Sequence, residues 1–168
     1  KYRNIVSQID SLVEDEGDII SVLSNISAAI HQTFKWLWVG FYIVKGDELI
    51  LGPFQGPVAC FRIKKGEGVC GKTWLLKKTI IVPDVEKFPG HIACSSQSKS
   101  EIVLPIFKNK KTYGVLDIDS KELNTFDRID QQYLEILVGI IERKLIDNSS
   151  LSYASDCCLI YFYFGFEI

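Results

Sequence analysis

The order of helical and strand patterns is the feature that most constrains the fold of this 168-residue chain. Apolar residues recur at helical spacing over about 5–13 and 18–34, and β-rich segments follow them. The short turns at 46–47 and 109–110 each join two such segments, which predicts two antiparallel hairpins. A final helical pattern covers about 127–147. This order predicts an α+β fold, with one largely antiparallel sheet flanked by helices.

The strands expected from these patterns are short. They cover 38–44, 48–51, 58–63, 79–82, 102–107 and 112–118, and a short helix is expected over 69–78. The segment from Asp84 to Ser100 has no clear periodicity, and a loop of this length more often has a function than a merely connecting role.

One domain is the default for a chain of this length, and we expect it to cover 1–147. The remaining residues, 148–168, form a C-terminal tail of unknown role. Because its part from Leu151 to Ile168 is aromatic and β-prone, we interpret it as an added strand, a dimer element or a non-native extension.

Charge and cysteine content exclude several classes of protein. The net charge is −2, so the chain lacks the basic surface that nucleic acids or anionic membranes require. Its longest apolar run is far shorter than the roughly 20 residues of a membrane-spanning helix. The five cysteines cannot form a closed set of disulfides, and none belongs to a C-x-x-C pair. These features favour a cytoplasmic protein with free or catalytic thiols.

Residues 66–71 form a literal G-x-G-x-x-G sequence, the pattern of dinucleotide-binding loops. The segment follows a predicted strand and precedes a predicted helix. A doubly wound nucleotide-binding fold needs successive βαβ crossovers, however, and only one such unit is possible here. We therefore favour a tight turn and the start of a helix over a nucleotide site.

Cys94 lies in the long loop, three residues after His91. A nearby cation or a helix N-terminus would increase the ionised fraction of such a thiol and make it a nucleophile. The alternative is a buried, unreactive thiol, which is the usual state of a free cysteine. Metal ligation by His91 with Cys60, Cys70 and Cys94 matches no known zinc spacing, so no metal is expected.

Three acidic residues belong to the second hairpin. Asp117 and Asp119 are two positions apart in one strand, so their side chains point to the same face. A three-residue turn would place Glu101 opposite Asp119, whereas a two-residue turn would place it on the other face. Like charges that share a face are costly unless they bind a cation or one of them stays protonated. The alternative is a solvated sheet edge.

Trp38 and Tyr42 lie on the same side of their predicted strand, because they are four positions apart. This spacing is typical of core packing. The alternative is the aromatic wall of a small-molecule pocket.

Several segments together resemble the free methionine-(R)-sulfoxide reductases, which are single-domain GAF proteins. The resemblance covers about 1–147 and rests on 38–42, 52–60, 66–71, 88–94, 100–105 and 114–120, in the family's order. It implies a GAF domain with a central antiparallel sheet, helices on one side and a loop-closed pocket on the other. It also implies reduction of the R epimer of free methionine sulfoxide, with no bound cofactor.

The resemblance also implies roles for individual residues. Cys94 matches the catalytic cysteine, Cys60 the resolving cysteine, and Cys70 a third cysteine of auxiliary role. A thiolate at Cys94 would attack the sulfoxide sulfur and become a sulfenic acid, and Cys60 would condense with it to a disulfide. A thioredoxin-type reductant would then restore both thiols. Five positions match the substrate pocket: Glu101, Asp117, Asp119, Trp38 and Tyr42.

A non-catalytic GAF sensor that binds a small molecule is the competing hypothesis. The presence of all three family cysteines favours the enzyme. We further expect that the terminal helices can support a homodimer.

Overall fold

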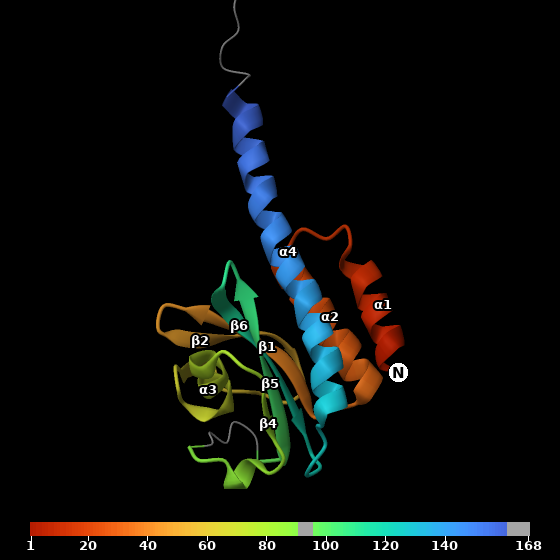
Figure 1. Ribbon diagram of the computed structural model, residues 1–168, viewed down its shortest axis with the longest axis vertical. Coiled ribbons are helices and arrows are strands. Elements are labelled where there is room, and N and C mark those ends of the chain that lie inside the picture. The colour runs from red at the N-terminus through yellow and green to blue at the C-terminus, as the bar shows by residue number, and fades with distance from the viewer. Residues whose placement is uncertain (91–95, 161–168) are drawn as a thin grey trace, which may run out of the picture.

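The protein consists of a six-stranded antiparallel sheet with helices on both faces (Figure 1). The computed structural model describes residues 1–90 and 96–160, with side chains in the last helix described up to Ile146. The strand order is β3-β2-β1-β6-β5-β4. The strands are β1 (Trp38–Lys45), β2 (Glu48–Gln55), β3 (Arg62–Lys64), β4 (Ile80–Val82), β5 (Ser100–Lys108) and β6 (Lys111–Ser120). The helices are α1 (Tyr2–Val13), α2 (Ile19–Phe34), α3 (Gly68–Leu76) and α4 (Arg128–Ile160), with a 3₁₀ turn η1 (Val85–Lys87).

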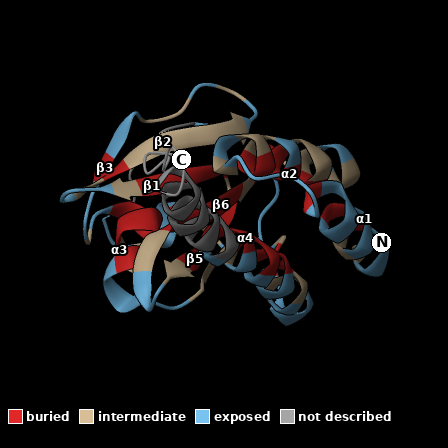
Figure 2. Cartoon of the chain, turned by 90° about the horizontal axis from the view of Figure 1, so that it is seen from above, coloured by how far each residue is buried: buried red, intermediate tan, exposed pale blue. Residues whose placement is uncertain are grey.

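The sheet separates two hydrophobic cores. Helices α1, α2 and α4 cover one face, and α3 covers the other (Figure 1). Because side chains alternate along a strand, Val39 and Phe41 of β1 pack toward the three helices, whereas Trp38 and Tyr42 pack toward α3. Buried residues therefore lie on α3 as well as on α2 and the sheet (Figure 2). This arrangement confirms the predicted α+β architecture, but the expectation of helices on one side only is corrected, because α3 packs on the other face.

The N-terminal helices follow from local sequence signals. Asp18 caps α2, because its carboxylate accepts a hydrogen bond from the backbone N–H of Ser21 at 2.8 Å. Helix α2 ends where Lys35 adopts a left-handed conformation, with φ of 61°. The apolar faces of α1 and α2 are fully buried against the sheet and α4. The predicted helices and the two hairpins are thus confirmed.

Two strand predictions need correction. Strand β2 continues past Leu51 to Gln55, because a register shift opposite Gly40–Tyr42 of β1 accommodates Gly52 and Pro53. The strand expected over 58–63 is wrong for 58–61, since β3 contains only Arg62–Lys64. The preceding residues are held by side chains of β1 instead of by a strand ladder, as described below.

The C-terminal helix is longer than expected. Helix α4 continues beyond Asp147 to Ile160, so this part of the tail is helical and is not an added strand. Most of the aromatic residues that make the tail β-prone lie at 161–168, outside the described residues. Within residues 1–90 and 96–160, no helix has both the length and the apolar character needed to cross a membrane.

Candidate functional site

The register of the second hairpin decides which acidic residues meet. Asn109 and Lys110 form a two-residue turn, and both have positive φ, of 50° and 64°. This turn alone would send Glu101 to the other face. The ladder shifts register beside Tyr113, however, and this β-bulge supplies the extra residue. As a result Glu101 pairs with Asp119, as a three-residue turn would have placed it.

The bulge brings three carboxylates to the α3 side of the sheet. Asp117 and Asp119 lie on β6 between β1 and β5, and Glu101 lies on β5. The side chains of Glu101 and Asp117 are buried, with exposures of 6% and 7%, while Asp119 is partly exposed. Cys70, from α3, completes the group: its sulfur and one carboxylate oxygen each of Glu101 and Asp117 lie within 4.8 Å of one another.

Burial makes these carboxylates weak acids. It is the largest cause that raises the pKa of Glu101 and Asp117 well above the ordinary range, and the charge of Asp119 adds to both shifts. Hydrogen bonds with Cys70 and Glu101 offset part of the rise for Asp117. Burial also raises the pKa of Asp119 to about 6, against a hydrogen bond donated by the Ser98 hydroxyl that lowers it. The site can therefore hold protons at neutral pH.

One acceptor atom in the site has no hydrogen-bond partner among the described residues. Oδ1 of Asp117 is buried and makes no hydrogen bond to any described residue. Such an atom is costly unless a donor reaches it, and a bound cation or N–H group would satisfy it. Carboxylates and a thiol at this spacing are also metal-ligand types. The sequence predicts no metal, and that stays a prediction.

Cys70 is buried at 3% exposure and is a free thiol. Burial, followed by the charges of Asp117 and Glu101, raises its pKa well above the ordinary value. The thiolate is the nucleophilic form of cysteine, so Cys70 is a poor nucleophile at neutral pH. Its environment suits a hydrogen-bonding role beside the carboxylates.

Trp38 and Tyr42 pack in the core on the α3 side, and they also hold the segment that contains Cys60. Their exposures are 4% and 2%, and their rings stack at 5.9 Å. The indole N–H of Trp38 donates to the carbonyl of Pro57 at 3.1 Å, and the Tyr42 hydroxyl donates to the carbonyl of Cys60 at 3.0 Å. These bonds explain why the segment before β3 does not form the expected strand.

The predicted cysteines are described to different extents. Cys60 is partly buried and disulfide-bonded. Cys94 and His91 lie outside the described residues, as do the side chains of Cys157 and Cys158. The geometry of Cys94 therefore stays a prediction from the sequence.

The glycine-rich segment 66–71 forms the turn into α3, as expected. The N–H of Gly66 donates to the carbonyl of Gly71 at 2.9 Å, so the segment closes on itself. A Cβ atom at Gly71 would overlap the carbonyl oxygen of Lys64, which explains the glycine there. Every pairing in the described sheet is antiparallel, which excludes the parallel strand arrangement of a doubly wound nucleotide-binding fold.

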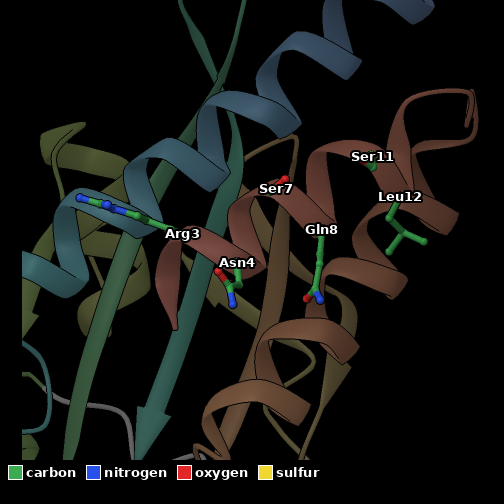
Figure 3. Close-up of a pocket in the computed structure, with 6 residues that line it drawn as sticks. All are labelled: Arg3, Asn4, Ser7, Gln8, Ser11 and Leu12. Atoms are coloured by element: carbon green, nitrogen blue, oxygen red, sulfur yellow. The ribbon is translucent and has the colours of Figure 1, made fainter.

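A concave region on the outer face of α1 differs in character from the carboxylate site. All of its lining residues are exposed, and they are shown in Figure 3: Arg3, Asn4, Ser7, Gln8, Ser11 and Leu12. It has no buried titratable side chain and lies in the helical layer. The carboxylate site on the other side of the sheet is therefore the stronger functional candidate.

Sequence reasoning missed two contacts of the site. Ser98, which donates to Asp119, lies at the end of the aperiodic loop, where no local pattern marks it. The bond from Tyr42 to the Cys60 carbonyl joins residues 18 positions apart, and only the folded sheet reveals it. Both contacts tie the loops to the carboxylate strands.

The fold and the antiparallel order of the sheet agree with one family model, that of the GAF domain, which matches residues 18–145. The chain belongs to the GAF domain family. This confirms the family resemblance and the predicted fold. GAF domain-containing protein A of Dictyostelium discoideum is 55% identical over 149 residues, covering 88% of this chain and 91% of that protein.

The relatives of this GAF domain protein include free methionine-R-sulfoxide reductases. The enzyme of that name from Saccharomyces cerevisiae is 45% identical over 153 residues, covering 86% of this chain and 85% of that enzyme. The X-ray structure of the Neisseria meningitidis enzyme in complex with its substrate has a TM-score of 0.87 and 48% identity, covering 90% of this chain and 91% of that one. The chain is thus closely related to these enzymes along nearly its whole length.

Proposed function

We propose that this protein reduces free L-methionine-(R)-sulfoxide to methionine. The observation that carries the proposal is the group formed by the buried Glu101 and Asp117 and the partly exposed Asp119, in which one oxygen of Asp117 makes no hydrogen bond to any described residue. Relatives with this fold are named free methionine-R-sulfoxide reductases. A free amino acid carries an α-ammonium group that a peptide-bound methionine lacks. Buried carboxylates therefore suit the free form of the substrate.

The same carboxyl groups can supply the proton that the reaction needs. A sulfoxide sulfur becomes electrophilic when its oxygen is protonated or hydrogen-bonded. A general acid works best when its pKa lies near the operating pH, and Asp119, whose pKa is raised to about 6, meets that requirement. Burial also raises the pKa of Glu101 and Asp117. One carboxyl group can thus donate the proton while another, ionised, pairs with the ammonium group.

The proposed reaction proceeds through cysteine chemistry. The thiolate of Cys94 attacks the sulfoxide sulfur, the oxygen passes to the cysteine as a sulfenic acid, and methionine leaves reduced. The thiol of Cys60 then condenses with the sulfenic acid, which forms a disulfide and releases water. The disulfide-bonded state of Cys60 supports its role as the resolving cysteine. Cys70, buried beside Asp117, supports the acids as the auxiliary thiol.

A thioredoxin-type dithiol would complete the cycle by reducing the disulfide. Such a cycle suits a cytoplasmic compartment, where reducing systems keep thiols available. We also propose that 1–147 acts as the catalytic unit, that the tail from 148 lies outside it, and that the terminal helices support a homodimer. Trp38 and Tyr42 would close the aromatic side of the substrate pocket.

The decisive experiment incubates the protein with free L-methionine-(R)-sulfoxide and dithiothreitol and measures methionine. We expect turnover in the wild type and in Cys157→Ser, and none in Cys94→Ser. Binding of the sulfoxide without methionine formation would instead favour the non-catalytic sensor. Equal activity of the Cys94→Ser variant would refute the mechanism.

The role of Cys60 can be separated from that of Cys94 by the same assay. A Cys60→Ser variant should complete a first turnover and then fail to cycle with thioredoxin, because its sulfenic acid has no resolving thiol. Full cycling with thioredoxin would reassign that role to Cys70.

A further inference from the structure

Two large apolar side chains that flank Cys60 in the sequence are almost fully exposed to solvent. Val58 is 86% exposed and Phe61 is 80% exposed. The other exposed large hydrophobic residues of the described chain have exposures between 45% and 59%. A phenylalanine this exposed costs free energy in water, and neighbouring exposed apolar residues mark interaction sites. Their position beside a disulfide-bonded cysteine connects them to the redox chemistry.

The exposure of these side chains is built into the fold. Three backbone carbonyls of the segment accept hydrogen bonds from the sheet: Pro57 from the Trp38 indole, Cys60 from the Tyr42 hydroxyl, and Phe61 from the N–H of Leu51 at 3.0 Å. The two donor side chains are themselves buried. These three hydrogen bonds fix the backbone of the segment against β1 and β2, and the side chains of Val58 and Phe61 are exposed to solvent.

The charge pattern around the segment resembles that of a protein interface. Residues 55–61 contain no charged side chain. Exposed basic residues follow directly at Arg62, Lys64 and Lys65. Arg62 pairs with Glu48 at 2.8 Å, so the charges lie beside the apolar segment and not within it. An uncharged apolar centre that includes an aromatic residue is typical of a protein-binding surface.

We propose that Val58 and Phe61 form the docking surface for a thioredoxin-type protein dithiol, which attacks the sulfur of Cys60. This inference rests on the proposed function, and it adds the surface and the sulfur that the reductant uses. A small thiol such as dithiothreitol needs only access to the sulfur. A protein reductant needs a complementary surface beside it, and the apolar pair supplies one where the disulfide lies.

The proposed reduction consists of two thiol–disulfide exchange steps. The reductant's first thiolate attacks the Cys60 sulfur, forms a mixed disulfide with it, and displaces the other cysteine of the protein disulfide as a thiolate. The reductant's second thiolate then attacks its own first sulfur and releases the Cys60 thiolate. Two electrons pass from the dithiol to the protein disulfide, the reductant leaves as a disulfide, and its two protons balance the two thiolates released.

The test measures the rate at which the protein disulfide is reduced, so it needs no methionine sulfoxide. The oxidised protein is mixed with reduced thioredoxin or with dithiothreitol, and free thiols are alkylated and counted by mass spectrometry over time. A Val58→Ser/Phe61→Ser double variant should react at least about tenfold more slowly with thioredoxin, the effect of losing one interface anchor. Its rate with dithiothreitol should stay within about twofold of the wild type.

A matched control is Ile129→Ser, since Ile129 is 59% exposed on α4, on the other face of the sheet. This variant should keep both rates. A thioredoxin variant that lacks its second cysteine should be trapped as a mixed disulfide on Cys60, identified by peptide mapping.

An unchanged thioredoxin rate in the double variant, or trapping on a different cysteine, would overturn the inference. A loss of self-association in the double variant with an unchanged thioredoxin rate would show that a second copy occupies the surface instead. Failure of the proposed function would look different: the thioredoxin rates would behave as expected while no methionine formed in the turnover assay.

Discussion

Replacing Asp119 by asparagine should stabilise the folded protein at neutral pH. The folded state raises the pKa of Asp119 from 3.8 to about 6. As pH rises between these values, the unfolded chain has released the proton while the folded chain still holds it, so stability falls until the folded carboxyl group ionises. About two pKa units correspond to about 3 kcal/mol at pH 8. Because the side chain is partly exposed, this value is an upper bound.

The assay is urea unfolding of wild type and Asp119→Asn at pH 4, 5 and 8, with a reductant present so that disulfides do not contribute. Asparagine keeps the shape of the side chain and can still accept the hydrogen bond from Ser98. The variant should be more stable by up to about 3 kcal/mol at pH 8, by about half of that at pH 5, and by little at pH 4. Methionine formation should fall in the same variant.

The result that would refute this reasoning is a variant no more stable than wild type at pH 8, or a gain that is the same at pH 4 and pH 8. Either would show that burial does not penalise the ionised form of Asp119. An Asp15→Asn variant serves as the control, because Asp15 is exposed. It should change stability by no more than about 0.5 kcal/mol at every pH.

Three further predictions concern single contacts. Tyr42→Phe removes the bond to the Cys60 carbonyl, so thermal unfolding should show a loss of about 1 kcal/mol, and thioredoxin-supported cycling should slow more than the first turnover. Asp18→Ala removes the N-cap of α2 and should also cost about 1 kcal/mol by urea unfolding, with unchanged activity per folded molecule. Gly71→Ala should cost several kcal/mol or prevent folding, because its Cβ meets backbone at Lys64, whereas Gly139→Ala, with open space around it, should not destabilise the protein.

The parts of the fold that the sequence predicted well are those set by neighbours in the chain. The start of the second helix near residue 18 and the turn at Asn109–Lys110 depend on a few adjacent residues, and both were expected. The alternation along β1 likewise placed Trp38 and Tyr42 on one face. These features depend on backbone preferences that act over a few positions.

The parts that were wrong depend on contacts between distant residues. The segment before Arg62 has the composition of a strand, yet its carbonyls bond to Trp38 and Tyr42 of β1. The sequence also left open which face of the sheet carries Glu101, because that face depends on the bulge beside Tyr113 as well as on the turn length. A side chain changes face when the register moves by one residue, so turn length alone was not sufficient.

The bulge also shows how one sheet can support both a stable core and a costly site. On the helical face, alternate residues of β1, β5 and β6 join the apolar core with α1, α2 and α4, and that core does not depend on the acids. On the other face, the same strands carry Glu101, Asp117 and Asp119 beside α3. Glu101 and Asp117 are buried and Asp119 is partly exposed, and these carboxylates destabilise the fold where they ionise. The apolar core on the helical face offsets that cost. A cationic ligand should therefore bind this face favourably, because its positive charge stabilises ionised carboxylates that are unfavourable in the folded protein without the ligand.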